Sequence, residues 1–386
     1  MHLRSLMQQK IRRGAITLNL RTFLRKTVLG GALTFAILLA VGVFQPTKTE
    51  AIDLGKLGGT LVGTATQQNE VRKSLDHYEN DGRYELFEQL KKSEGVIEDP
   101  DLNAELARVM TRLTSTIAKT EPGVENKPYN YFINPQTAFN AFCSLGHNVS
   151  VNVGVFQFFD NNEDKIAAVV AHELVHGQRN HPINGAKKKM TVDFVQKIAG
   201  SQLGGGSKLA VDVVATNTKA AGITKPNEWE ADNIAFSYIT EAGYNPGAPA
   251  AVWQRVIDKM SSGGSKGLFD DLLNPSTHPG EKERRDNYSK KLSEYGNQKV
   301  TVNPATGEIK VNNKVFMKPA PFANMSGVER SYLIAGNLAA VYHKNEASTQ
   351  AINDNGVVKI GDNAIVEPCS ADISAEELVR ILNEIK

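Results

Sequence analysis

The sequence has few cysteines, almost no excess of charge of either sign, and no second long apolar run. Its 386 residues include only two cysteines, Cys143 and Cys369. A disulfide scaffold is therefore excluded, although a single bridge could form outside the cytoplasm. The 44 basic and 42 acidic residues leave a net charge of +2, which argues against nucleic acid as an electrostatically bound partner. After Phe44 no apolar stretch reaches transmembrane length, which argues against a multi-pass membrane protein.

The first 51 residues have the three parts of a secretory signal. An uncharged run from Val28 to Phe44 is followed by the small residues Thr49 and Ala51, which suit cleavage after Ala51. The basic residues before the run are Arg12, Arg13, Arg21, Arg25 and Lys26. An uncleaved membrane anchor is the alternative, because the run is at the short limit for spanning a bilayer. In both cases we expect the rest of the chain outside the cytoplasm, either periplasmic or secreted.

The remaining sequence, with 41% hydrophobic and 22% charged residues overall, is long enough for one large or two modest domains. Helical periodicity runs over residues 67–92 and 100–119, and the β-rich stretches YNYFIN and NVSVNVGVFQFF follow. Further helices are expected at 227–242 and 248–260. The predicted domain bounds are 1–51 for the leader or anchor, 52–65 for a Gly/Thr-rich linker, 66–296 for the main domain and 297–386 for a C-terminal module.

Short strands replace long helices after Asn297, and the C-terminal module contains a weak internal repeat. GEIKVNNKVFMKP (307–319) aligns without gaps onto GVVKIGDNAIVEP (356–368), and each copy has a turn pair between apolar runs. Each copy is followed by a capping box, Ser326 with Glu329 and Ser374 with Glu377. The pattern predicts two ββα units, with chance similarity of short segments as the alternative.

The stretch VVAHELVHGQRN, residues 169–180, carries the strongest chemical pattern. On an α-helix, His172 and His176 lie one above the other and could bind a single ion. Glu173 points about 100° round the helix, so it could reach a water at the metal without binding the metal. Asn161 and Asn162 offer N-terminal caps for this helix. H-E-x-x-H is the pattern that metallopeptidases use for this chemistry.

A hydrolytic zinc site needs a third protein ligand and an open fourth position. His181 invites comparison with the metzincin signature, which has glycine three residues after the second histidine and a third histidine six residues after it. Here Arg179 and Pro182 stand at those positions. The metzincin interpretation therefore fails, and the third ligand must come from elsewhere.

The stretch NEWEADNIAFSYI offers carboxylates instead. Glu228 and Asp232 are four residues apart on one helical face, and Glu230 lies off that face. Glu228 could complete a set of two histidines and one glutamate. Asp232, one turn on, could accept the outer N–H of a ligating histidine and fix its tautomer. A solvated acidic helix face is the alternative interpretation.

Three motifs in order, H-E-x-x-H, E-x-E-A-D and S-T-H-P-x-x-x-x-R, resemble those of the HtpX-, BepA- and CAAX-prenyl-protease-like zinc metallopeptidases, which are gluzincins. The resemblance covers roughly residues 66–295 and includes VIEDPDLNAEL and the NAF at 140–142. It implies an α+β fold, with a mainly helical zincin-type peptidase domain and a small edge sheet. The C-terminal module of two ββα repeats would be added to that domain.

The resemblance also implies roles for individual residues. His172, His176 and Glu228 would be the ligands of one Zn²⁺ ion per chain. Glu173 would be the general base, and Asp232 would support a ligand from behind.

Three further residues match family positions. His278 in STHP would lie near the zinc, where it would stabilise the oxyanion or cover the open position; a plain loop histidine is the alternative. Arg284 falls on the family's arginine after that motif. His181 also matches a family position, and we expect it to be structural.

The sequence departs from the family after NAF, where members usually continue with Pro-Gly-Gly. Here Cys143-Ser144-Leu145-Gly146-His147 stands instead. This edge is expected to receive substrate as an added strand, so the change affects subsite specificity rather than the chemistry. We expect Cys143 to be packed or disulfide-bonded rather than a nucleophile, because its sequence neighbours offer no activation.

The sequence thus predicts a zinc metalloendopeptidase that cleaves misfolded or envelope proteins outside the cytoplasm. Its partners would be protein or peptide substrates, with membrane or cell-envelope association through the N-terminus and no nucleic acid. One alternative is a zinc-binding chaperone or scaffold module, in which four ligands would close the metal site. Another is a zinc hydrolase that acts on something other than peptides.

Overall fold

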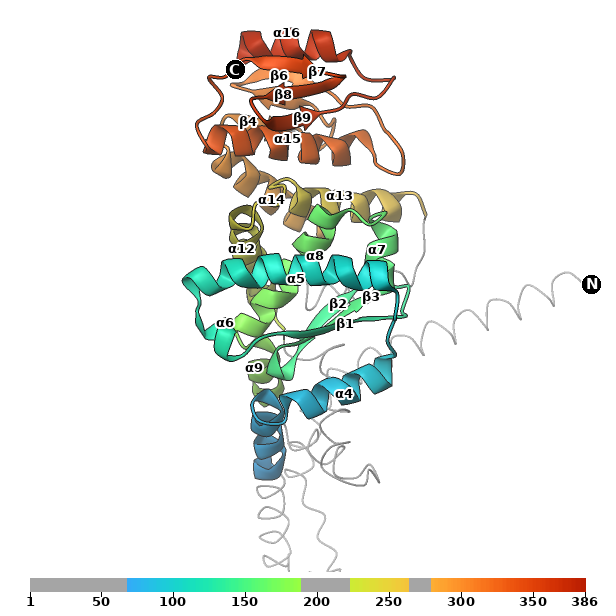
Figure 1. Ribbon diagram of the computed structural model, residues 1–386, viewed down its shortest axis with the longest axis vertical. Helices are drawn as coiled ribbons and strands as arrows, with labels where there is room; N and C mark the ends of the chain where they lie inside the picture. Colours follow the sequence, from blue (N-terminus) through green and yellow to red (C-terminus); the bar gives the residue numbers. More distant parts are fainter. Residues whose placement is uncertain (1–67, 189–222, 264–278) are drawn as a thin grey trace, which may run out of the picture. The chain divides into compact units, whose positions relative to one another are not determined.

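The computed structural model describes residues 68–188, 223–263 and 279–386 (Figure 1). The leader 1–51, the linker 52–65, the segment SQLGGGSK at 201–208 and His278 lie outside the described residues. Within the described residues the fold is α+β and mainly helical, as the sequence predicts.

The helix α5 (Pro100–Thr120) confirms the prediction of a helix over 100–119. The side chain of Asp99 accepts hydrogen bonds from the first turn, and Pro100 suits that turn because its ring sets a helical φ. The short helix α6 (Gly123–Asn126) follows where TEPGVENKP breaks the pattern. The apolar stripe of α5 is at most 2% exposed and consists of Leu106, Val109, Met110, Leu113 and Ile117. Through this stripe α5 packs against α8 and the sheet.

Two helices precede α5, where the periodicity predicts one over 67–92. Residues 68–79 are helical, and α4 (Arg83–Glu94) follows after a turn. At the turn, the carbonyl of His77 accepts hydrogen bonds from the N–H groups of Asn80 and Gly82. These bonds replace the i→i−4 bonds of an α-helix, so the first helix ends there. Both helices contribute to a second, smaller core.

A three-stranded sheet takes up only part of the β-rich stretches, because VGVFQF in the second of them forms the helix α7 (Val153–Phe158) instead. Its strands are β1 (Asn130–Asn134), β2 (Ala141–Ser144) and β3 (Asn148–Asn152), in the order β1-β3-β2. The strand β3 pairs parallel with β1 and antiparallel with β2, so β2 lies at an edge. A tight 3₁₀ turn, η1 (Leu145–His147), links β2 to β3, and Gly146 adopts a φ of +70° there.

The helix α8 (Glu163–Gln178) carries H-E-x-x-H and follows the short helix α7 (Val153–Phe158). Asn162 caps it by accepting a hydrogen bond from the N–H of Lys165, as expected. It is buried on most of its circumference, since α5, β2, α12 (Lys225–Glu241) and α13 (Ala248–Ser261) all pack against it. A helix surrounded in this way can hold its side chains rigidly.

Two more helices complete this part. The helix α9 (His181–Lys188) follows α8, and α14 (Glu281–Tyr295) packs against α12 and α13. Figure 1 shows α8 and α12 meeting below α13.

The C-terminal residues form two equivalent halves. The first consists of β4 (Val300–Val302), β5 (Ile309–Val311), β6 (Lys314–Met317) and α15 (Gly327–His343). The second consists of β7 (Ala351–Asp354), β8 (Val357–Ile360), β9 (Asn363–Val366) and α16 (Ala375–Ile385). Each half thus has three strands before its helix, where the sequence predicts two. The first strand was missed because it lies outside the aligned segments, although the turn pair Asn355-Gly356 between β7 and β8 was an available signal in the second half.

The two halves repeat in register. The pairs Ile309↔Met317 and Lys310↔Val315 in the first half recur as Val358↔Val366 and Lys359↔Ala364 in the second, with an irregularity at the same place. Ser326 and Ser374 cap α15 and α16 in the same manner, by accepting hydrogen bonds from the N–H groups of Glu329 and Glu377. Only this part of each predicted capping box forms, because the side chain of Glu329 pairs with Lys165 and Arg255 and that of Glu377 pairs with Arg380. Figure 1 shows the strands of both halves between α15 and α16.

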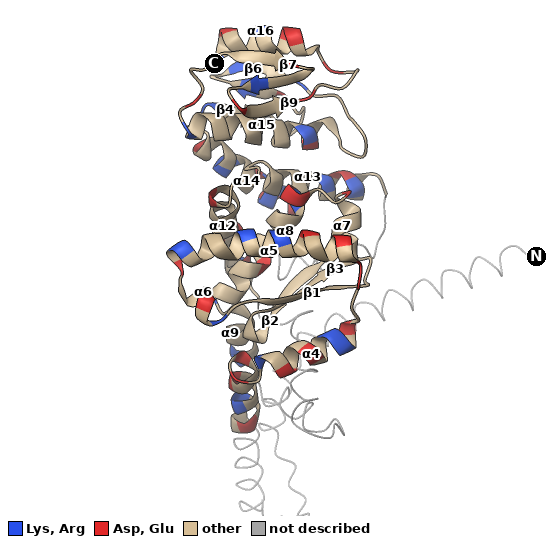
Figure 2. Cartoon of the chain, in the orientation of Figure 1, with Lys and Arg blue, Asp and Glu red and all other residues tan. Residues whose placement is uncertain are grey.

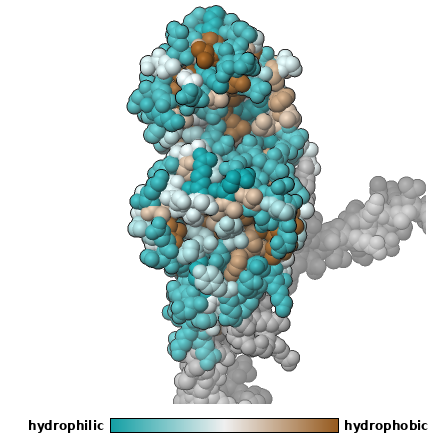
Figure 3. Space-filling view, in the orientation of Figure 1, coloured by the Kyte–Doolittle hydropathy of each residue, from teal (hydrophilic) through white to brown (hydrophobic). Residues whose placement is uncertain are grey.

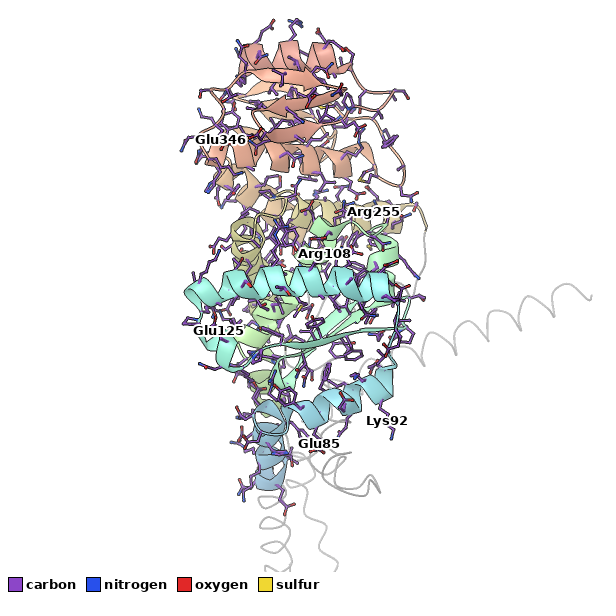
Figure 4. The ribbon with its side chains drawn as sticks, in the orientation of Figure 1. Glu85, Lys92, Arg108, Glu125, Arg255 and Glu346 are labelled. Carbon is purple, nitrogen blue, oxygen red and sulfur yellow. The ribbon has the colours of Figure 1, made fainter. Side chains whose placement is uncertain are left out.

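The helix α15 lies against α13 and α14. The buried Glu329 pairs with Lys165 of α8 and with Arg255 of α13, which is labelled in Figure 4. The side chain of Asn245 donates to the carbonyl of Leu333 and to the side-chain oxygen of Asn337. The domain boundary at 297 stays a prediction, and these contacts cross it.

Neither cysteine forms a disulfide: Cys143 is buried and Cys369 is partly exposed, and both are free. Across the described ranges no helix is long and apolar enough to cross a membrane. Figure 2 shows acidic and basic residues interspersed on the face drawn, in keeping with the small net charge. Figure 3 shows that most of the described surface on this face is hydrophilic, with scattered apolar residues.

Candidate metal centre

The two histidines of α8 converge as the i,i+4 spacing predicts. The Nε2 atoms of His172 and His176 lie 3.1 Å apart, and their rings are arranged edge to face. The side chain of His176 is 2% exposed and that of His172 is 12% exposed. Two imidazole nitrogens this close repel each other when both carry a proton or both are bare, so they share either one proton or one metal ion.

The helix α12 brings Glu228 to the same point. Its Oε2 lies 3.5 Å from Nε2 of His172, and its Oε1 lies 3.5 Å from Nε2 of His176. In a tetrahedral site with bonds of about 2.0–2.1 Å, neighbouring ligand atoms are about 3.3 Å apart. The three candidate ligand atoms, all within 4.8 Å of one another, therefore fit a zinc ion in spacing and in chemistry. Among the residues that the structure describes, they form the candidate metal-binding group.

Asp232 stands behind His172, where the sequence predicts it. Its Oδ1 is 3.0 Å from Nδ1 of His172, the nitrogen on the far side of the ring from the candidate metal position, and the carboxylate is completely buried. Arg284 donates from Nε to Oδ2 of Asp232 at 2.7 Å and also lies 3.3 Å from Glu228. Tyr288 donates to Asp232 at 2.9 Å. The guanidinium of Arg284 stacks over the ring of Trp253, with its Cζ 3.9 Å from the ring centroid.

Glu173 lies beside the candidate ligands and is not one of them. Its Oε2 accepts a hydrogen bond of 3.0 Å from the backbone N–H of Cys143 on the edge strand β2. Burial raises the pKa of Glu173 to about 7, with the charge of Glu228 acting in the same direction and that of His172 against it. A carboxylate with such a pKa can take up and release a proton near neutral pH.

The two histidines differ in their proton affinity. Burial and Arg284 disfavour the charged form of His172, but the carboxylates of Asp232 and Glu228 outweigh them and raise its pKa to about 9. Burial and the nearby His172 hold the pKa of His176 well below its usual value. The pair thus holds one positive charge among the carboxylates, which is the charge that a bound cation would replace.

His181 and Glu230 lie next to the candidate ligands, although the sequence predicts no direct role for them there. His181 Nδ1 is 2.9 Å from Nδ1 of His176, and its Nε2 is 3.2 Å from Oε2 of Glu230. The sequence predicts a structural role for His181, but it does not predict the contact of His181 with the candidate ligand His176. The spacing of five residues after His176 was the available signal. For Tyr288 and Trp253 the sequence offered no signal, because both contacts depend on how α13 and α14 pack.

Two residues from the sequence analysis remain apart from this geometry. His278 lies outside the described residues, so its role stays a prediction. Cys143 is buried, and burial raises the pKa of its thiol well above the usual value. The thiol therefore stays protonated, which agrees with the expectation that Cys143 is packed rather than reactive.

Comparisons with known proteins show the family of this chain. Residues 100–291 match the model of peptidase family M48. The chain is 24% identical to the beta-barrel assembly-enhancing protease of Escherichia coli (strain K12) over 235 residues, which are 58% of this chain and 45% of the relative. It is 27% identical to the mitochondrial metalloendopeptidase OMA1 of Schizosaccharomyces pombe (strain 972 / ATCC 24843) over 145 residues, 38% of this chain and 41% of that protein. The chain thus spans less than half the length of these relatives.

A buried helix with H-E-x-x-H whose histidines meet a glutamate from a second helix defines the metallopeptidase class. Within that class, the chain belongs to peptidase family M48. The family predicted from the three sequence motifs is confirmed.

Proposed function

We propose that this protein is a zinc-dependent endopeptidase that hydrolyses peptide bonds in proteins outside the cytoplasm. The observation that carries the proposal is the convergence of His172, His176 and Glu228 on one point, with the carboxylate of Glu173 beside it. A zinc ion held by these three residues would supply a Lewis acid that polarises a water and the peptide carbonyl.

Glu173 would act as the general base and then as the general acid. Its carboxylate takes a proton from the attacking water and delivers it to the nitrogen of the leaving amine. Burial strengthens this carboxylate as a base, because it favours the protonated form. The N–H of Cys143 holds Oε2 of Glu173 and so fixes the direction of the carboxylate.

The substrate backbone would enter along the free edge of β2. Among the described strands β2 pairs only with β3, and the N–H of Cys143 points away from β3 towards Glu173. An extended peptide added to this edge would pass next to Glu173 and the metal-binding residues. We expect His278 to stabilise the oxyanion there, as the family resemblance implies.

The proposed substrates are misfolded or envelope proteins. Two observations support this proposal: the sequence features of the leader are those of a secretory signal, and one relative is a beta-barrel assembly-enhancing protease. Periplasmic or secreted location, and attachment to the membrane through an uncleaved leader, belong to this proposal.

Cleavage of unfolded casein tests the proposal, with peptide products identified by mass spectrometry and zinc content measured on the same preparation. We expect one zinc per chain in the wild type and in Glu173→Gln, with a loss of about 10²–10⁴-fold in kcat/KM for the variant. The exposed Glu98→Gln serves as the matched control and should cut like the wild type. Equal cleavage by Glu173→Gln would show that Glu173 is not the base. A wild type that binds zinc and cuts nothing would favour the scaffold alternative.

A further inference from the structure

Behind the second histidine of H-E-x-x-H lies a chain of hydrogen-bonding groups that the proposed reaction does not use. We propose that His181 and Glu230 form a relay that holds His176 in one tautomer and one orientation for metal binding. His181 and Glu230 are thus positioning residues, which act on the metal only through His176. This inference rests on the zinc centre of the proposed function and extends it to residues behind the ligands.

The contact between the two histidines is specific in its atoms. Nδ1 of His176 faces Nδ1 of His181 at 2.9 Å, and the rings cross at 67°. The two residues are 2% and 5% exposed, so water does not replace this hydrogen bond. The other nitrogen of His181, Nε2, lies 3.2 Å from Oε2 of Glu230.

These contacts allow one arrangement of protons when a metal is bound. Nε2 of His176 faces His172 and Glu228, so it is the nitrogen available to a metal. A neutral imidazole that binds through Nε2 carries its proton on Nδ1. That proton must be donated to Nδ1 of His181, which then carries its own proton on Nε2 and donates it to Glu230. Each nitrogen of the two rings thus has one partner.

The same geometry excludes His181 as a ligand of this ion. Its Nδ1 contacts the side of the His176 ring opposite Nε2, and its Nε2 points to Glu230. His181 therefore stands one imidazole ring farther from the metal position than His176 does.

The far end of the relay is anchored to three helices. Glu230 belongs to α12, two residues after Glu228, and its Oε1 lies 3.6 Å from Nε of Arg179 at the end of α8. Arg179 donates two hydrogen bonds, of 3.1 and 3.2 Å, to the carboxylate of Glu121 at the end of α5. Tyr238 donates to the same carboxylate at 2.6 Å. Glu230 is therefore held in place although 45% of its side chain is exposed.

The two candidate ligand histidines are thus supported in different ways. Asp232 contacts His172 directly, whereas Glu230 acts on His176 through a second imidazole. Partners of this kind orient a ligating histidine and raise its basicity, and their loss commonly weakens metal binding by 10–100-fold.

The test is the zinc dissociation constant of the full chain, measured by competition with a chromophoric chelator. We expect His181→Phe to raise this constant about 10–100-fold, because Nδ1 of His176 then loses its acceptor. His181→Gln should recover most of the affinity, since its amide oxygen can accept the same proton. Glu230→Ala should weaken binding as well. Glu241→Gln, an exposed glutamate at the end of the same helix, should leave it unchanged.

A second measurement separates positioning from folding. The melting temperature in excess chelator reports the stability of the chain without metal. If His181→Phe and His181→Gln lower it equally and bind zinc as tightly as the wild type, His181 is structural and the relay is wrong. The ¹⁵N shifts of the imidazoles in zinc-loaded protein report the tautomers directly. We expect neutral His181 with its proton on Nε2, and a proton on Nδ1 would overturn the relay.

Failure of the relay and failure of the proposed function give different results. If the wild type binds no zinc, both the proposed function and the relay are wrong. If the wild type binds zinc and cuts casein, but His181→Phe and Glu230→Ala bind zinc as tightly as the wild type, only the relay is wrong.

Discussion

Nζ of Lys165 lies 2.5 Å from Oε1 of Glu329, and the two side chains are 1% and 0% exposed. Arg255 donates from Nε to the other oxygen of Glu329 at 2.7 Å. Lys165 is two turns before His172 on α8, whereas Glu329 belongs to α15, beyond the residues that match the family model. The helix α15 therefore supplies the buried countercharge for α8, the helix that carries two of the candidate metal ligands.

The first prediction concerns this buried pair. Glu329→Gln leaves Lys165 and Arg255 without their countercharge in the interior, and we expect it to lower the free energy of unfolding by about 3–5 kcal/mol. Urea unfolding followed by tryptophan fluorescence measures the change. Glu377→Gln is the matched control, because Glu377 occupies the same position, three residues after the N-cap serine, in the second half and pairs with an exposed arginine. Similar stability for the two variants would show that the buried pair contributes little.

The second prediction is a dependence of stability on pH in the C-terminal module. Burial alone would raise the pKa of Asp372, but hydrogen bonds from Arg330 and from the N–H groups of Ala320 and Cys369 outweigh it and hold the pKa at about 2. The folded pKa is below the ordinary 3.8, so the stabilisation is present above about pH 4 and is lost as the pH falls towards 2. Its size is about 2 kcal/mol.

Urea unfolding between pH 5 and pH 2 checks this dependence. The difference between the wild type and Asp372→Asn should be largest at pH 5 and should shrink towards pH 2. Asp362→Asn, in an exposed turn, should show no such convergence. A difference that stays constant with pH would contradict the prediction.

The third prediction concerns the turn between β2 and β3. Gly146 has a φ of +70°, and a Cβ there would lie 2.5 Å from Cβ of Arg83 and 2.8 Å from the carbonyl oxygen of Tyr78. Gly146→Ala should therefore cost more than the roughly 1–2 kcal/mol of a left-handed backbone alone. Gly356→Ala isolates that backbone cost, because Gly356 has a φ of +90° with open space around it. Equal losses in melting temperature would show that the close approach to Arg83 is unimportant.

The fourth prediction concerns metal removal. Excess EDTA should abolish casein cleavage and lower the melting temperature, and zinc should restore both. Zinc at 100 times its dissociation constant stabilises the folded chain by about 2.7 kcal/mol. Glu228→Gln should lose most of this zinc-dependent shift because it removes a charged ligand. A variant that keeps the full shift would remove Glu228 from the proposed ligand set.

Much of the candidate site could be predicted from the sequence because helix geometry is local. The spacing of His172 and His176 was sufficient to place both imidazoles on one face, and the spacing of Glu228 and Asp232 did the same on α12. That the two faces meet came from the resemblance to a family, and the structure brings them together. The roles of these residues stay predictions.

The sequence alone determined the features that depend on residues close together in the chain. These are the caps of α8 and α15, the buried stripe of α5, and the pairing of the two histidines. Only the tertiary structure decided that His181 contacts His176 on the face away from the metal, and that Glu329 pairs with Lys165, 164 residues earlier. Such contacts depend on how separate helices pack, and neither residue spacing nor composition records the distance between elements far apart in the chain.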